Sequence, residues 1–150
     1  MPPQPRRILI IEDNEADVNL TLAALWDARG SNEIHVVQSG EEATAFLRRA
    51  GRSPGVPVPD LVLLDLNLPR KGGFEVLEEL KADPHLRGIP VVVVSGSDRD
   101  DDIARAYNLQ AAAYLVKPLN VDEYFSSIRA VKELWFHRAA LRAKGSEAGA

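Results

Sequence analysis

The sequence has no cysteine, no long apolar run and no excess of basic residues. Without cysteine there are no disulfide bonds, no zinc sites built on thiolates and no redox-active thiol pairs. No apolar stretch approaches the length of about 20 residues that a membrane helix needs, so we expect a cytoplasmic protein without a membrane partner. The formal net charge of −4 argues against nucleic-acid binding, which depends on many basic contacts to phosphate.

The 150 residues are enough for one compact domain with a core of its own. With 45% hydrophobic residues, the composition differs from that of chains that stay disordered. We expect a domain over residues 7–143, preceded by a short N-terminal extension at 1–6. A flexible tail is expected at 144–150.

Short apolar runs rich in Ile, Val and Leu predict strands that are buried on both faces. These runs cover residues 7–11, 61–64, 90–94 and 113–116, with a weaker candidate at 33–37. A segment with helical spacing of apolar residues follows each run. Strand and helix therefore alternate five times, which predicts a doubly wound parallel α/β sheet with helices on both faces. The last helix extends from about residue 120 to beyond residue 141.

Polar side chains follow these strands at the edge where doubly wound sheets bind their ligands. They are Glu12 and Asp13 after the first strand, Asp65 after the third, Ser95 after the fourth and Lys117 after the fifth. Three carboxylates at one edge would repel each other and raise at least one pKa, unless a cation lies among them. Because Mg²⁺ prefers oxygen ligands, it fits this set better than zinc does.

The same residues could transfer a phosphoryl group. A carboxylate can act as a nucleophile towards phosphorus, and Asp65 is the candidate because it ends the central strand. Glu12 and Asp13 would hold the metal. Lys117 would neutralise phosphoryl oxygens, and the Ser95 hydroxyl would donate to another of them.

Four segments, in this order and spacing, resemble the receiver domains of two-component response regulators. They are IIEDN at 10–14, LVLLDLNLPRKGG at 61–73, VVVVSGS at 91–97 and YLVKPL at 114–119. The resemblance implies a flavodoxin-like (βα)5 fold and a signalling domain rather than an enzyme. Asp65 would accept a phosphoryl group from the phosphohistidine of a sensor histidine kinase, with Mg²⁺-dependent self-phosphorylation and slow autodephosphorylation as its only activities.

The resemblance also assigns roles to individual residues. Besides Glu12, Asp13 and Asp65, the backbone carbonyl of Asn67 would bind Mg²⁺. Ser95 and Tyr114 match the switch hydroxyl and aromatic residue of the family, and the Lys117–Pro118 peptide bond is cis in such domains. Phosphorylation would then alter the surface made by the fourth helix, the fifth strand and the fifth helix, with no attached output domain.

A looser resemblance concerns single-domain receivers associated with phytochromes. They are similar in their long proline-bearing loop before the third strand and in their aromatic-rich last helix, which implies a phytochrome as the partner kinase. Exposed aromatic residues at a helix end mark contact surfaces, so we expect a homodimer through the last helix. The candidate contact residues are Tyr124, Ile128, Trp135 and Phe136.

Other functions remain for the same residues. A phosphohydrolase with an Asp nucleophile often has a second acid two residues later to protonate the leaving group, but here that position is Asn67. A flavodoxin-type cofactor site would need a phosphate-binding loop after the first strand, where Glu12 and Asp13 would repel phosphate. A phosphorylation-independent scaffold of the same fold would not be expected to keep the whole set of acids, hydroxyl and lysine.

Overall fold

The computed structural model describes the backbone of residues 6–26 and 32–149 and the side chains of residues 6–26 and 32–135. In this part of the chain five parallel strands form one sheet in the order β2-β1-β3-β4-β5. The strands are β1 (Arg6–Ile11), β2 (Asn32–Val37), β3 (Leu61–Leu64), β4 (Val91–Ser95) and β5 (Ala113–Val116). The weak candidate at 33–37 is thus a full member of the sheet, and the order reverses around β1.

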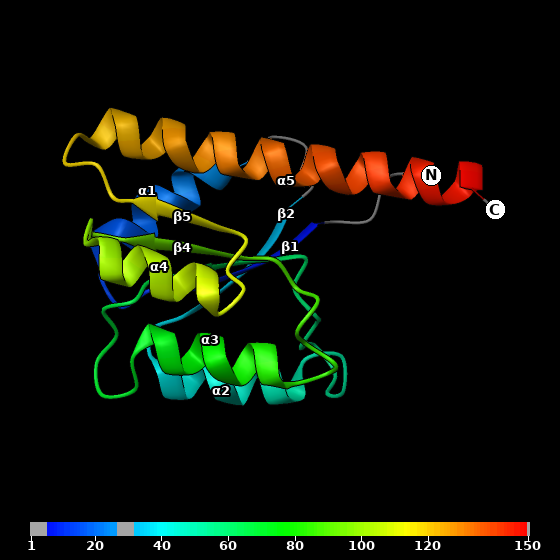
Figure 1. Ribbon diagram of the computed structural model, residues 1–150, viewed down its shortest axis with the longest axis horizontal. Helices are drawn as coiled ribbons and strands as arrows, with labels where there is room; N and C mark the ends of the chain where they lie inside the picture. Colours follow the sequence, from blue (N-terminus) through cyan, green and yellow to red (C-terminus); the bar gives the residue numbers. More distant parts are fainter. Residues whose placement is uncertain (1–5, 27–31, 150) are drawn as a thin grey trace.

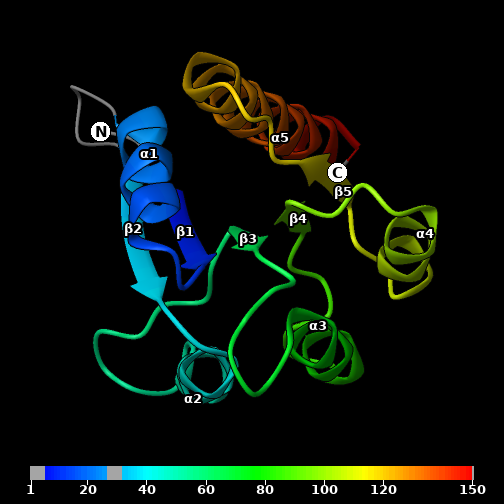
Figure 2. The ribbon, with the colours of Figure 1, turned by 90° about the vertical axis from the view of Figure 1, so that its left-hand side faces the viewer.

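Helices cover both faces of the sheet (Figure 1). They are α1 (Glu15–Leu25), α2 (Gly40–Arg49), α3 (Gly73–Ala82), α4 (Asp100–Asn108) and α5 (Val121–Gly149). Figure 2 shows α1 and α5 on one side of the sheet, α2 and α3 on the other, and α4 next to β5. This arrangement confirms the predicted flavodoxin-like fold.

Two separate cores hold these layers together, because successive side chains of a strand point to opposite faces. Leu9 and Ile11 of β1 belong to the core under α2 and α3, whereas Ile8 and Ile10 belong to the core under α1 and α5. Both faces of the strand are therefore buried, which is why its sequence is uniformly apolar.

The register of the sheet brings distant polar residues to one edge. Ile11 is paired with Leu64, and the Asp65 N–H donates to the Ile11 carbonyl at 3.0 Å. The residues that follow these two strands, Glu12 and Asp65, are consequently neighbours. At the other end of the same edge, the Lys117 N–H donates to the Ser95 carbonyl at 2.8 Å.

Two of the residues predicted to form a dimer contact are in the core instead. The side chains of Tyr124 and Ile128 are only 4% and 1% exposed, so this part of the prediction is wrong. They lie one helical turn apart on the face of α5 that packs against α1 and the sheet. Trp135 also packs against this core and is partly buried, while the side chain of Phe136 lies outside the described residues.

The last helix is longer than a compact domain of this size requires. The backbone of α5 is helical as far as Gly149, which includes most of the segment expected to be a tail. No proline follows Pro118 in the sequence, so every residue of α5 has the backbone N–H that helical hydrogen bonds need. None of the helices in the described residues has the length and apolar composition required to cross a membrane.

Candidate functional site

Three carboxylates meet at the carboxyl ends of β1 and β3. One oxygen each from Glu12, Asp13 and Asp65 lies within 4.8 Å of the others. Glu12 and Asp65 are buried, whereas Asp13 is exposed. The cluster is thus closed on the side of the sheet and open to solvent on the side of Asp13, as a site that receives a small group from outside requires.

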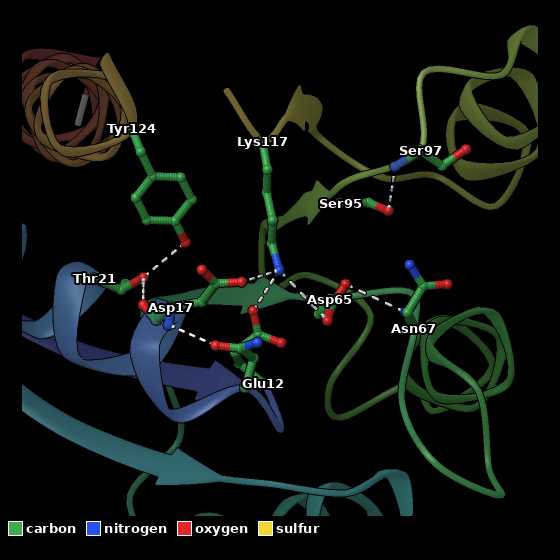
Figure 3. Close-up of polar contacts among 10 residues, drawn as sticks. Glu12, Asp17, Thr21, Asp65, Asn67, Ser95, Ser97, Lys117 and Tyr124 are labelled. Atoms are coloured by element: carbon green, nitrogen blue, oxygen red, sulfur yellow. Dashed lines mark hydrogen bonds and ion pairs between the residues drawn. The ribbon is translucent and has the colours of Figure 1, made fainter. Parts of the chain in front are cut away.

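Lys117 brings a positive charge to this cluster from the loop after β5. Its Nζ donates to Glu12 Oε1 at 2.5 Å and to Asp17 Oδ2 at 2.9 Å. It also forms an ion pair with Asp65 Oδ2 at 3.6 Å. Figure 3 shows the ammonium group between Asp17 on one side and Asp65 on the other, with Glu12 below.

The crowding of charge changes the protonation of Glu12. Burial, together with the neighbouring Asp65 carboxylate, raises the pKa of Glu12 to about 8, although Lys117 acts in the opposite direction. This agrees with the expectation that three adjacent acids raise at least one pKa when no metal is among them. The other oxygen of this group, Oε2, is buried and has no hydrogen-bond partner among the described residues.

Lys117 stays charged in these surroundings. Burial by itself lowers the pKa of Lys117, but its hydrogen bonds to Glu12 and Asp17 and the charge of Asp65 outweigh burial and hold the pKa above its ordinary value. The lysine is therefore a permanent cation at this edge of the sheet.

Ser95 and Asn67 flank the cluster on the side away from α1 (Figure 3). Ser95 is the last residue of β4 and fully buried, and its Oγ accepts a hydrogen bond from the Ser97 N–H at 3.2 Å. The Asn67 N–H donates to Asp65 Oδ1 at 3.2 Å. This bond turns the loop after β3 back towards Asp65 and fixes the orientation of its carboxylate.

Tyr114 lies on β5 and is half-buried against the core under α2 and α3. Its hydroxyl donates to the Ser97 carbonyl at 2.8 Å, and its N–H donates to the Tyr107 hydroxyl at 3.2 Å. Tyr114 and Ser95 thus contact the same residue, Ser97, from two strands. The two predicted switch residues are linked through this loop.

The predicted cis bond between Lys117 and Pro118 is not present. The described residues, which include Lys117 and Pro118, contain no cis peptide bond. For a peptide bond before proline the trans form is favoured by about 0.5–1 kcal/mol. A preference this small does not by itself decide between the cis and the trans form.

One acid of the site, Asp17 on α1, and the hydroxyl pair behind it were not among the residues predicted from the sequence. Thr21 Oγ1 donates to the Asp17 carbonyl at 2.7 Å and lies 2.9 Å from the Tyr124 hydroxyl. Because the Thr21 proton is already used, Tyr124 donates to Thr21. Burial raises the pKa of Tyr124, which keeps this proton in place. The only signal in the sequence was an acid in the first turn of the helix that follows Glu12 and Asp13.

Comparison with known proteins agrees with this geometry. The chain is 38% identical over 139 residues to the response regulator Rcp1 of Synechocystis sp., covering 93% of this chain and 95% of that protein. The structure of the phosphorylated cyanobacterial phytochrome response regulator RcpA is similar, with a TM-score of 0.83 and 42% identity over 88% of this chain and 94% of that one. The Mn²⁺-bound form of Rcp1 has a TM-score of 0.81 and 39% identity over 87% and 94% of the two chains.

The pattern that describes the response regulator receiver domain matches residues 8–129. This range includes every strand after the first two residues of β1 and each of the acids, the serine and the lysine at the carboxyl edge of the sheet. The chain belongs to the family of receiver domains of two-component response regulators.

Proposed function

We propose that Asp65 is the phosphoacceptor of this receiver domain and takes its phosphoryl group from a phosphohistidine of a sensor histidine kinase. The observation that carries the proposal is the position of Asp65: it directly follows the central strand β3, next to two further acids and 3.6 Å from the ammonium group of Lys117. In the reaction a carboxylate oxygen of Asp65 bonds to phosphorus while the bond between phosphorus and the histidine nitrogen breaks. The histidine is released without its phosphoryl group.

The donor set fits a divalent cation of the Mg²⁺ type. All the candidate ligands are oxygens, from Glu12, Asp13, Asp65 and the Asn67 carbonyl, and Glu12 Oε2 is a buried oxygen without a hydrogen-bond partner among the described residues. A bound metal would neutralise negative charge on the transferred phosphoryl group. The Mn²⁺-bound form of Rcp1 supports the same choice of cation.

The chain's own residues would orient and stabilise the incoming group. The Asn67 N–H holds Oδ1 of Asp65, and Oδ2, which lies beside the Lys117 ammonium group, would be the oxygen that attacks. Lys117 would pair with an oxygen of the phosphoryl group, and the Ser95 hydroxyl would donate to another. Because these groups are already placed at the edge of the sheet, they need little reorganisation when the phosphoryl group arrives.

The readout surface in this proposal is formed by α4, β5 and α5. Ser95 would move towards the phosphoryl group, and Tyr114 would respond because both contact Ser97. Large apolar side chains are exposed in this region: Tyr107, Val116, Leu119 and Val121. Such side chains suit a surface that binds a protein partner. The similarity to Rcp1 and RcpA supports a phytochrome as the kinase.

A direct test is to incubate the protein with a small phosphodonor and Mg²⁺ and measure its intact mass. The expected result is one added phosphoryl group per chain. When a chelator is present during the incubation, no adduct should form. A protein that stays unmodified under both conditions would contradict the proposal and favour a phosphorylation-independent scaffold.

We also propose that the exposed side of α5 mediates a homodimer. Since Tyr124 and Ile128 are buried, the contact would use the neighbourhood of Trp135, where Leu134 is half exposed. Replacing Leu134 with serine should shift the protein towards the monomer in sedimentation velocity, because the contact would lose apolar area. The adjacent exposed Glu133→Gln serves as control. Equal sedimentation of the wild type and Leu134→Ser would argue against this surface.

A further inference from the structure

Lys117 has a partner that the phosphorylation chemistry does not use. Of the three carboxylates around its Nζ, Glu12 and Asp65 belong to the acidic cluster, but Asp17 comes from α1. The hydrogen bond to Asp17 measures 2.9 Å, whereas the distance to Asp65 is 3.6 Å. The ammonium group is thus bound more closely by α1 than by the phosphoacceptor.

Asp17 is held firmly enough to act as an anchor. Its N–H is bound by the side chain of Asn14, which caps the helix, at 3.0 Å. Its carbonyl is bound by the Thr21 hydroxyl at 2.7 Å, and Thr21 is bound in turn by the buried Tyr124 of α5. With its backbone held on both sides, Asp17 keeps its carboxylate directed at Lys117.

The positions of Asp17 and Asp65 place them in competition for the same cation. In Figure 3 the two carboxylates lie on opposite sides of the Lys117 ammonium group. A phosphoryl group on Asp65 would add negative oxygens on the Asp65 side of the ammonium group, opposite Asp17. To pair closely with these oxygens, Lys117 would shift towards Asp65, and the 2.9 Å hydrogen bond to Asp17 opposes this shift.

We propose that Asp17 is a positioning residue that restrains Lys117 in the unphosphorylated protein and thereby limits how strongly the site holds a phosphoryl group. The inference rests on the proposed phosphoacceptor function of Asp65. It adds a residue of α1, linked to α5 by the hydrogen bonds of Thr21 and Tyr124, that sets the balance between the unphosphorylated and the phosphorylated protein.

The test uses beryllium fluoride with Mg²⁺ as a stable stand-in for the phosphoryl group, with binding measured by titration calorimetry. Asp17→Asn should bind it about three- to tenfold more tightly than the wild type, since a charged hydrogen bond no longer competes for Lys117. Asp17→Glu keeps the negative charge and should return the affinity towards the wild-type value. Thermal unfolding of both variants checks that they fold.

The matched control is Glu15→Gln, which removes the same charge from an exposed position in the same turn of α1. It should leave the affinity unchanged. Unchanged or weaker binding by Asp17→Asn, or an equal gain from Glu15→Gln, would overturn the inference. If the wild type itself binds no beryllium fluoride, the phosphoacceptor proposal fails instead, so the two failures are distinguishable.

Discussion

Replacing Asp65 with asparagine is expected to abolish the phosphoryl adduct completely. The amide has no anionic oxygen with which to attack phosphorus, while its size and shape match those of the carboxylate. Glu12 is buried and hydrogen-bonded to Lys117, so it is not free to replace Asp65. Intact mass after incubation with a phosphodonor and Mg²⁺ measures the effect. An undiminished adduct on Asp65→Asn would mean that another residue is the acceptor.

The variant should nevertheless fold, which separates loss of chemistry from loss of structure. Asp65 raises the pKa of the neighbouring Glu12, so without the Asp65 charge Glu12 ionises more readily and pairs with Lys117. We expect its free energy of unfolding in metal-free urea titrations to be no lower than that of the wild type. Asp60→Asn is a suitable control because Asp60 directly precedes the same strand, at its opposite end. Its adduct should equal that of the wild type.

Replacing Gly73 with alanine is expected to damage both stability and phosphorylation. Gly73 is the buried first residue of α3, and a Cβ there would overlap the backbone carbonyl oxygen of Asp65 and the Cα of Leu66. The Gly73 N–H also donates to the Leu66 carbonyl at 3.1 Å. Neither obstacle is a flexible side chain, so the backbone that carries Asp65 must shift.

Overpacking of this kind costs about 1–3 kcal/mol, which urea unfolding would measure as a lower midpoint. The displaced backbone should also slow the phosphorylation of Asp65, measured by intact mass over time. Gly72→Ser is the matched control: the nearest atom to a Cβ at Gly72 is the Leu66 carbonyl oxygen at 4.0 Å, and serine is a favourable helix cap. Wild-type stability of Gly73→Ala would show that the loop accommodates the methyl group.

The way the site forms explains why most of its members could be found from the sequence. Glu12, Asp13, Asp65, Ser95 and Lys117 each follow an apolar run directly or after one residue, and the parallel sheet places the carboxyl ends of all its strands at one edge. Their convergence therefore depends only on the alternation of strands and helices. No detailed knowledge of helix packing is needed for these five residues.

Asp17 could not be assigned in the same way. An acid in the first turn of a helix is stabilised by the helix dipole alone, so its residue type carries no information about a partner. Its contact with Lys117 joins residues 100 positions apart in the sequence. Only the packing of α1 beside the loop after β5 produces this contact.

The direction of the side chains on α5 could not be predicted from the sequence either. Tyr124 and Ile128 have the spacing of one apolar helix face, and that spacing fits a dimer contact as well as an internal one. In the structure this face packs on α1, where Tyr124 finds the Thr21 hydroxyl. The sequence by itself determined the order of strands and helices and the residues at the edge of the sheet, because both follow from local apolar patterns. The tertiary structure decided which face of α5 is buried and which acid of α1 binds Lys117, because each depends on contacts between segments far apart in the chain.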